Sequence, residues 1–275
     1  MVWELRARKF DLAISFDRKL RPALLCWLAR IPVRVGPSRV FDDKPSRVTW
    51  LYTHTVPIKH DLDDTLQAET YQEIIRGFTG VEGHERPILP QPTEMQREKA
   101  AAFLLPAAGK RKIGLCVKGT FGLKTWPKEY FVEIVRALYA RYDAAFYVTG
   151  APGDHAYAEE VIAAIGLPVE NLCGKTNLME LAAFYAQLDL LVSVDTGGAH
   201  IAAVTGVPLV VMFGCTSPRR WHPISDNATA FTSHEPCCPC SYGETDCPSY
   251  PQPHCLYHVR PEEIIAACVR HLDGK

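Results

Sequence analysis

The sequence contains no run of the roughly 18 consecutive apolar residues that a membrane-spanning helix needs. Its first residues, MVWELRARKFDLAISF, also lack the long apolar block of a secretory signal peptide. The 275 residues are 47% hydrophobic and 22% charged, a balance that excludes a disordered chain. We therefore expect a cytoplasmic globular protein with one large domain or two modest ones.

The chain also lacks a large net charge, which is −1 by formal count, but its charges are spread unevenly. Residues 1–50 carry eleven Lys and Arg against five Asp and Glu, which gives +6 and leaves −7 for the rest. This basic section could face a phosphorylated substrate or, peripherally, the anionic surface of the inner membrane. Because the charges are dispersed, a solvated face is the alternative, and we expect no nucleic-acid partner.

The first part of the chain predicts a small α/β domain. The expected strands are Phe10–Phe16 and Val33–Gly36, and the expected helices are Lys19–Leu28, Asp63–Phe78 and Glu94–Leu105. Residues 37–60 look irregular, and the Pro-rich and charged stretch Glu82–Pro92 is typical of a linker. Asp61-Leu-Asp63 spells the DxD of metal-dependent transferases, but its place before a helical pattern favours helix capping.

From residue 112 short apolar runs alternate regularly with helix-spaced segments. The expected strands are Ile113–Val117, Ala144–Thr149, Leu190–Val194 and Leu209–Phe213, and the expected helices are Pro127–Tyr142, Ala156–Ile165, Leu178–Gln187, Ala199–Val204 and Pro261–Leu272. Strands that alternate with helices predict a parallel, doubly wound sheet. Ligands of such sheets bind beyond the carboxyl ends of the strands. We place the two domains at residues 1–105 and 106–275.

The most informative motif is a buried strand that runs directly into Asp195-Thr196-Gly197-Gly198 at the start of a helix. Free N–H groups and the positive end of the helix dipole converge there and form an anion site. Thr196 can donate its hydroxyl, and Asp195 can fix the loop or accept from a ligand. His200 falls in the first helical turn. The alternatives are a tight turn capped by Asp195 and a purely structural His200.

Two further strand ends carry polar residues. In the loop after Val117, Gly119 to Thr125 resembles a phosphate-binding Walker loop superficially, but Leu123 stands where that loop needs glycine. Thr120 and Lys124 in this loop can still meet a diphosphate, with Lys124 as a point charge. The segment VTGAPG ends at Asp154, which could meet a ribose hydroxyl. The alternatives are that Lys124 is an ordinary surface lysine and that the segment ending at Asp154 is a plain turn.

The cysteines near the carboxyl end are the most metal-like feature of the sequence. Cys237 and Cys240 have CxxC spacing, and Cys247, His254 and Cys255 follow, so that four zinc ligands are available. The later spacing lacks a second CxxC, which favours reduced thiols in a Pro-rich loop. The sequence leaves open whether Cys237, Cys240, Cys247 and Cys255 bind zinc or an iron–sulfur cluster.

The ordered set of segments KTWP, GAPGD, GKT, SVDTGGAH and TSPRRW resembles the carboxyl-terminal domain of glycosyltransferase family nine, which contains the ADP-heptose:lipopolysaccharide heptosyltransferases. The upstream DLAISFDRKLRPALLCWLARIPVRVG resembles the later part of that family's amino-terminal domain. The resemblance implies the GT-B arrangement of two Rossmann-like domains. It also implies an inverting, metal-independent transfer of a heptose-like sugar from an ADP-sugar to a lipopolysaccharide-core-type acceptor.

The resemblance also implies roles for individual residues. Lys124 matches the lysine at the donor phosphates, with Thr120 in the same loop. Asp195, Thr196 and Gly197 match the family's diphosphate motif, with Gly198 beside them, and His200 matches its following histidine. Asp154 lies near the family's ribose acid. No cofactor beyond the donor substrate and no catalytic metal is implied; Lys124 and Asp195 are the expected catalytic residues.

One part of the family pattern is not found. The family begins with a strand and a Gly-containing loop whose aspartate is thought to deprotonate the acceptor, whereas this chain opens at what resembles the middle of that domain. We therefore expect an incomplete amino-terminal domain, with Asp17 the first acid to test as a base. The alternatives are an enzyme of the same fold that uses another nucleotide sugar, such as a UDP-sugar, and a non-catalytic nucleotide-sugar-binding protein.

Overall fold

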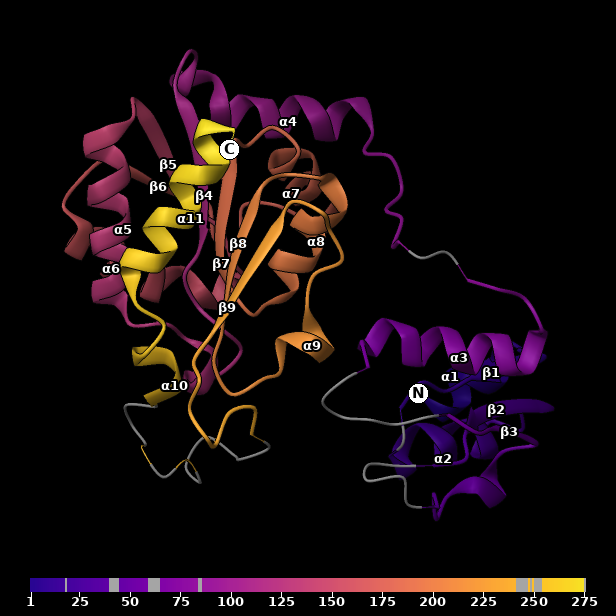
Figure 1. The fold of residues 1–275 in the computed structure, drawn as a ribbon. Helices are drawn as coiled ribbons and strands as arrows, with labels where there is room; N and C mark the ends of the chain where they lie inside the picture. The colour runs from indigo at the N-terminus through magenta and orange to yellow at the C-terminus, as the bar shows by residue number, and fades with distance from the viewer. Residues whose placement is uncertain are drawn as a thin grey trace. The chain divides into compact units, whose positions relative to one another are not determined.

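The computed structural model shows a chain that divides into two compact units, Met1–Glu85 and Arg86–Lys275 (Figure 1). The residues that the structure describes are 1–17, 19–39, 45–58, 65–83, 86–240, 247, 249 and 254–274. Asp61 and Asp63 lie outside these residues. Within the described ranges, no helix has the length and apolar character needed to cross a membrane.

The amino-terminal unit contains a three-stranded parallel sheet in the order β1-β2-β3. Its elements are α1 (Val2–Ala7), β1 (Leu12–Ile14), α2 (Leu20–Leu28), β2 (Val33–Pro37), the 3-10 helix η2 (Thr49–Leu51), β3 (His54–Val56) and α3 (Gln67–Thr79). The predicted strands and helices of this unit are present, with bounds that differ from the predicted ones by up to four residues. Strand β3 lies in the segment that was expected to be irregular, and α1 was not predicted.

Among the described residues of this unit, buried apolar side chains form two small clusters. Ile74 of α3 is buried with Val35 and Val56 of the sheet. Ala23 of α2 is buried with Leu51 and its neighbour Tyr52.

The carboxyl-terminal unit is built on a six-stranded parallel sheet in the order β6-β5-β4-β7-β8-β9. The strands are β4 (Arg111–Cys116), β5 (Ala144–Val148), β6 (Val169–Asn171), β7 (Leu190–Val194), β8 (Leu209–Phe213) and β9 (Ala228–Thr232). In sequence order this is the 3-2-1-4-5-6 arrangement of a Rossmann sheet, whose direction of winding reverses between β4 and β7. The predicted doubly wound α/β fold is confirmed.

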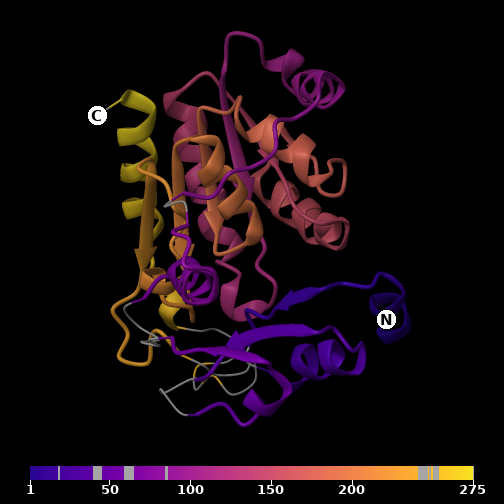
Figure 2. The same ribbon diagram turned by 90° about the vertical axis from the view of Figure 1, so that its right-hand side faces the viewer.

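Helices cover both faces of this sheet (Figures 1 and 2). The longer helices are α4 (Glu94–Leu104), α5 (Lys128–Arg141), α6 (His155–Ile165), α7 (Leu178–Tyr185), α8 (Gly197–Thr205) and α11 (Pro261–Asp273). The short ones are η3 (Leu105–Ala107), η4 (Gly122–Lys124), η5 (Pro152–Asp154), α9 (Pro218–Trp221) and α10 (His254–Tyr257). Helices α5, α6 and α11 pack together on one face, and α4, α7 and α8 on the other.

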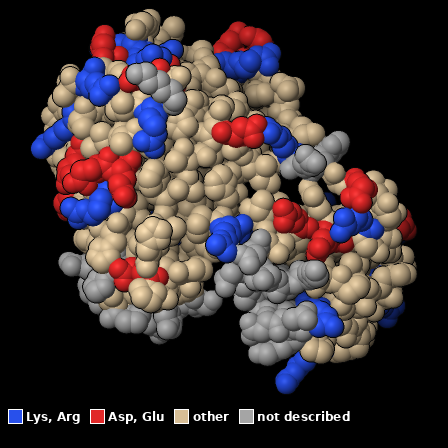
Figure 3. Space-filling view, viewed as in Figure 1, with Lys and Arg blue, Asp and Glu red and all other residues tan. Residues whose placement is uncertain are grey.

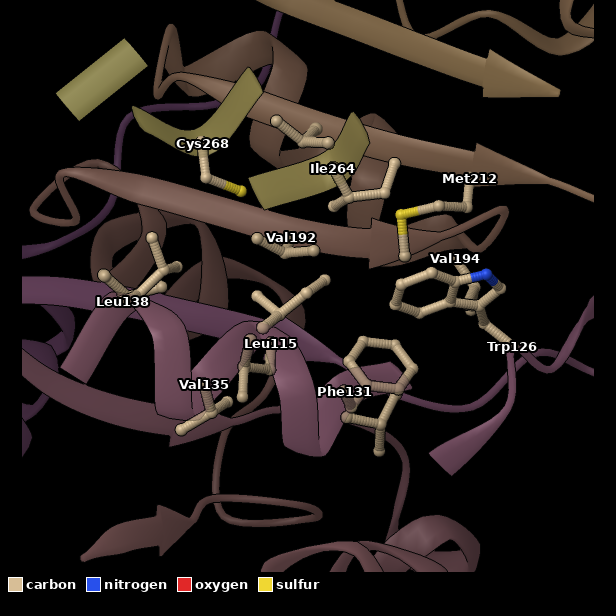
Figure 4. Close-up of a cluster of buried hydrophobic side chains, with 14 of the residues drawn as sticks. Leu115, Trp126, Phe131, Val135, Leu138, Val192, Val194, Met212, Ile264 and Cys268 are labelled. Carbon is tan, nitrogen blue, oxygen red and sulfur yellow. The ribbon is translucent and has the colours of Figure 1, made fainter. Parts of the chain in front are cut away.

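The main core lies between the sheet and the layer of α5 and α11 (Figure 4). Trp126 is its largest side chain and is fully buried, and its indole Nε1 donates a hydrogen bond to the Val259 carbonyl at 3.0 Å. Leu115, Val192 and Met212 from three neighbouring strands meet Phe131 of α5 in the same cluster. This packing fixes the strands whose carboxyl ends form the candidate site.

Helix α4 belongs to the carboxyl-terminal unit. Its Leu104 is buried in the second core cluster, and the rings of Phe103 and Phe184 of α7 lie 6.4 Å apart. Lys99 also pairs with Glu180 of α7 at 2.8 Å. The division of the chain therefore comes earlier than the boundary after residue 105 that the sequence suggested, and falls within the predicted linker.

Candidate functional site

A cavity of about 710 Å³ opens at the carboxyl edge of the six-stranded sheet. It is bordered by the loops after β4 and β5 and by the first turn of α8, which follows β7. The loops after β4 and β7 diverge where the winding of the sheet reverses, which is where open α/β sheets bind ligands. A second cavity of about 680 Å³ lies between residues 87–92 and helices α4 and α7, away from the strand ends. We therefore place the site in the first.

The first turn of α8 forms one wall of the cavity. Thr196, the N-cap residue, has an extended backbone (φ −141°, ψ 167°), and its hydroxyl does not cap the helix. Thr196, Gly197 and Gly198 line the cavity, so the helix directs its positive end and its first N–H groups toward this space. A Cβ on Gly198 would lie 3.1 Å from both Cys116 Sγ and Tyr185 Oη. Glycine thus lets this turn approach β4 and α7 closely.

Lys124 and Asp195 form an ion pair beside this wall. Lys124 Nζ lies 2.7 Å from Asp195 Oδ2, and the two side chains are only 17% and 7% exposed. The Thr216 hydroxyl donates to the same carboxylate oxygen at 2.6 Å. The three residues follow β4, β7 and β8, which are adjacent in the sheet. Because an ammonium group has three donors, Lys124 retains capacity for a further acceptor while paired with Asp195.

His200 of α8 lies close enough to this pair to sense its charges. Burial is the main cause that lowers the pKa of His200; Lys124 and His222 lower it further, and Asp195 acts in the opposite direction. The imidazole is therefore neutral near pH 7 and can serve as a hydrogen-bond donor or acceptor.

Asp154 and Lys118 face the cavity from its other side. Lys118 Nζ lies 3.2 Å from Asp154 Oδ1, and Asp154 Oδ2 accepts a hydrogen bond from the Ala151 amide at 2.9 Å. Both residues line the cavity. The carboxylate thus holds the loop after β5 in shape while it remains at the cavity wall.

A buried polar network forms the floor. Tyr185 Oη lies 2.7 Å from Thr149 Oγ1 and 3.2 Å from Cys116 Sγ, and all three residues border the cavity. Burial raises the pKa of Tyr185 well above its ordinary value, so that its hydroxyl stays protonated. The network connects β4, β5 and α7 immediately beneath the first turn of α8.

The cysteines that the sequence marked as candidate ligands do not assemble into a metal centre in the described residues. There, no group of three or more His, Cys, Asp or Glu is arranged to hold a metal ion. Cys237 is exposed, Cys240 and Cys247 are half-buried and Cys255 is buried, all as free thiols. Cys238 Sγ instead donates to the Gly214 carbonyl at 2.7 Å.

The structure brings the predicted site residues together in two groups. Thr120, Asp154, Thr196, Gly197 and Gly198 line the cavity itself. Lys124, Asp195 and His200 form the neighbouring charged cluster.

Sequence reasoning missed three contributors to the site. Lys118 follows a strand end directly, a signal that could have identified it. Thr216 follows the strand Leu209–Phe213 closely and opens the segment TSPRRW, so its position after a strand end could have identified it. Tyr185 sits within an apolar helical pattern, where no local feature distinguishes it from a core residue.

Comparisons with known proteins agree with this geometry. Residues 1–250 match glycosyltransferase family 9 (heptosyltransferase). A putative glycosyltransferase of Haemophilus influenzae is 26% identical over 240 residues, which cover 82% of this chain and 67% of that protein. Lipooligosaccharide heptosyltransferase 2 of the same organism is 30% identical over 238 residues, 80% of this chain and 65% of that protein. This chain thus spans about two thirds of the length of these curated relatives.

Solved structures show the same fold. Escherichia coli ADP-heptose lps heptosyltransferase II has a TM-score of 0.74 at 21% identity, covering 99% of this chain and 80% of that one. E. coli heptosyltransferase WaaC, solved with ADP, has a TM-score of 0.69 at 18% identity, covering 98% and 75%. These likenesses show the fold, and the match of residues 1–250 to the family model shows that the chain belongs to glycosyltransferase family 9, the heptosyltransferases.

Proposed function

We propose that the protein is an inverting, metal-independent glycosyltransferase that moves a heptose-like sugar from an ADP-sugar to a lipopolysaccharide-core-type acceptor. The observation that carries the proposal is the convergence of the α8 amino terminus and Lys124 beside one cavity. The names of the relatives support the acceptor class, and the complex of WaaC with ADP supports the donor class.

The chemistry requires stabilisation of the departing nucleoside diphosphate, which gains negative charge as the sugar leaves. In this proposal the diphosphate lies over Gly197 and Gly198, where the helix N–H groups point. Lys124 contacts it with a donor that Asp195 does not occupy. Fixed donors of this kind stabilise developing charge without a metal ion.

The rest of the donor would be held by the opposite wall. Asp154 accepts from a ribose hydroxyl once Lys118 turns toward the ligand. Tyr185 and Thr149 keep the first turn of α8 in position from below. Asp195 acts through Lys124, whose ammonium it orients, so it is a positioning residue in this scheme.

The acceptor hydroxyl needs a base as it attacks the anomeric carbon from the face opposite the diphosphate. Asp17 is the acid that we would test first in the amino-terminal unit. It is exposed, it lies three residues after β1, and its Oδ1 accepts from the Lys19 amide at 3.0 Å. If the chain catalyses transfer, Asp17→Asn should remove turnover and leave ADP binding unchanged.

The proposal is tested by thermal unfolding of the chain with ADP, ADP-heptose and UDP in the presence of a chelator. A ligand at 100 times its Kd stabilises the native state by about 2.7 kcal/mol, which raises the melting temperature. We expect ADP and ADP-heptose to stabilise and UDP to do so less. Loss of the ADP effect with chelator would contradict metal independence. Stabilisation by UDP alone would identify another nucleotide-sugar enzyme, and binding without transfer would identify a non-catalytic binder.

A further inference from the structure

Three of the five tryptophans lie exposed on the amino-terminal unit. Trp3, Trp50 and Trp27 have 77%, 68% and 44% of their surface accessible. The rings of Trp27 and Trp50 meet edge to face, with centroids 6.2 Å apart. Large aromatic side chains bury much apolar area in folded proteins, so an exposed group of them is a signal of a partner.

Arginines are interleaved with these rings. Arg6, Arg30 and Arg34 line a hollow of about 500 Å³ together with Trp27 and Leu28. The guanidinium of Arg6 lies 5.3 Å from the centroid of the Trp3 ring. Leu28 is also exposed. We call these residues, with Trp3 and Trp50, the Trp–Arg surface.

Backbone carbonyls hold two of these arginines in place. Arg6 Nη2 donates to the Leu28 carbonyl at 2.8 Å, which ties α1 to the end of α2. Arg34 Nε donates to the Leu51 carbonyl at 2.8 Å. Carbonyl oxygens carry no net charge, so these bonds orient the guanidinium groups without neutralising them. The guanidinium groups of Arg6 and Arg34 are therefore oriented by the backbone and keep their positive charge.

We propose that the Trp–Arg surface docks onto a bilayer that contains anionic phospholipid. Tryptophan concentrates at the boundary between headgroups and acyl chains because its ring is apolar and its N–H is polar. Arginine buries its stem along apolar surface and keeps its charge at the headgroups, which attract it. This inference does not depend on the proposed donor site.

The charge of the Trp–Arg surface favours a lipid bilayer over a second copy of the chain as its partner. Arg6, Arg30 and Arg34 line the hollow with no acidic residue among its described lining residues, so three positive charges gather where an anionic membrane would lie. Residues 1–85 as a whole are nearly neutral, with thirteen Lys and Arg against twelve Asp and Glu, so this positive charge is local to the surface. A second copy of the chain related by a two-fold axis would set the same positive surface against itself. In the view of Figure 3, Lys and Arg lie among Asp and Glu on both units, so neither unit presents charge of one sign alone on that face.

The test is co-sedimentation of the full chain with vesicles of pure phosphatidylcholine or with phosphatidylglycerol added. We expect binding only with phosphatidylglycerol, a blue shift of tryptophan fluorescence on binding, and weaker binding as salt is raised. Equal binding to both vesicles, or no binding to either, would overturn the proposal. Self-association that disappears in the variants below would assign the surface to a second copy instead.

Matched variants locate the contact. Arg30→Glu should weaken vesicle binding on the order of tenfold or more, because it replaces an attraction with a repulsion. Trp3→Ser/Trp50→Ser should weaken it further, and both side chains are exposed enough for the fold to tolerate the change. Lys110→Glu and Leu105→Ser are the controls, since these residues are exposed on the other unit. Unchanged vesicle binding by both Arg30→Glu and Trp3→Ser/Trp50→Ser would contradict the proposal.

The same variants separate this proposal from the proposed donor chemistry. Their melting temperatures should rise with ADP as in the parent chain, because the donor cavity lies wholly in residues 86–275. Failure of ADP binding in every protein, with vesicle binding intact, would count against the donor site alone.

Discussion

The two units of the chain differ sharply in how well they bury their apolar side chains. Residues 86–275 cover a six-stranded sheet on both faces and bury Trp126 and Tyr185 completely. Of the seventeen large apolar side chains exposed in the described residues, eleven lie in residues 1–85. The carboxyl-terminal unit therefore has its own closed core and cavity, whereas the amino-terminal unit presents apolar surface to its surroundings.

The largest expected effect comes from separating the two units. Residues 86–275 expressed alone should be monomeric and unfold cooperatively in urea, because core and sheet are complete within them. Residues 1–85 alone should aggregate, because exposed apolar surface and the short strands of a three-stranded sheet are poorly protected. If residues 86–275 alone were molten or aggregated, the claim that this unit has a complete core of its own would be wrong.

Within the stable unit, the next effect comes from the buried ion pair. Lys124→Met leaves the Asp195 carboxylate buried, with the Thr216 hydroxyl still donating a hydrogen bond to it. It should lower the free energy of unfolding by about 3–5 kcal/mol, as expected for a buried pair that loses one member. Lys124→Met/Asp195→Asn should recover part of this loss, but ADP binding should be weak in both proteins.

Urea denaturation of these proteins measures the effect, with Lys110→Met as the exposed control. A cost below about 1 kcal/mol for Lys124→Met would show that the pair behaves as a solvated surface contact. It would also show that the site is not formed before the ligand binds.

A smaller effect is expected from the floor of the cavity. Tyr185→Phe removes a hydroxyl that lies 2.7 Å from the Thr149 hydroxyl, at an expected cost of about 0.5–1.5 kcal/mol in unfolding free energy. ADP affinity should fall severalfold because the first turn of α8 loses support. Tyr139→Phe, on an exposed part of α5, is the matched control. Equal calorimetric Kd values for the two variants would refute the positioning role.

The smallest effect concerns pH. Burial lowers the pKa of His200, so the free protein holds it neutral at pH 7. A bound diphosphate favours the imidazolium form and raises that pKa, so ADP should bind more tightly as the pH falls from 8 to 6. The gain in ADP affinity should be below about fivefold, which corresponds to a rise of less than one unit in the pKa of His200 on binding. His200→Asn should lose this gain. Ionisation of the nucleotide affects both proteins equally, so the difference between their pH profiles reports on His200.

Central parts of the fold could be predicted because buried parallel strands are continuous apolar runs. Leu190–Val194 and Leu209–Phe213 were predicted with the bounds that the structure shows. Strands β3, β6 and β9 were not predicted, and each lies at the edge of its sheet. Edge strands are partly exposed, so their sequences carry a weaker pattern.

The site residues also divide into those that a local sequence pattern identifies and those whose contacts depend on the folded sheet. Asp195, Thr196 and Gly197 were found because a strand–helix junction is a local feature with a physical role. The pairing of Lys124 with Asp195 was not predicted, because it depends on β4 and β7 being neighbours in the sheet. The sequence places Asp195 at a strand end but does not reveal that its side chain is nearly fully buried there.

The central claim is that the donor site is complete within the carboxyl-terminal unit. Calorimetric titration of ADP into residues 86–275 and into the full chain, both with chelator, tests it most directly. The account predicts Kd values within about threefold of each other, a difference of less than 1 kcal/mol. Tight binding by the full chain with no measurable binding by residues 86–275 would contradict it.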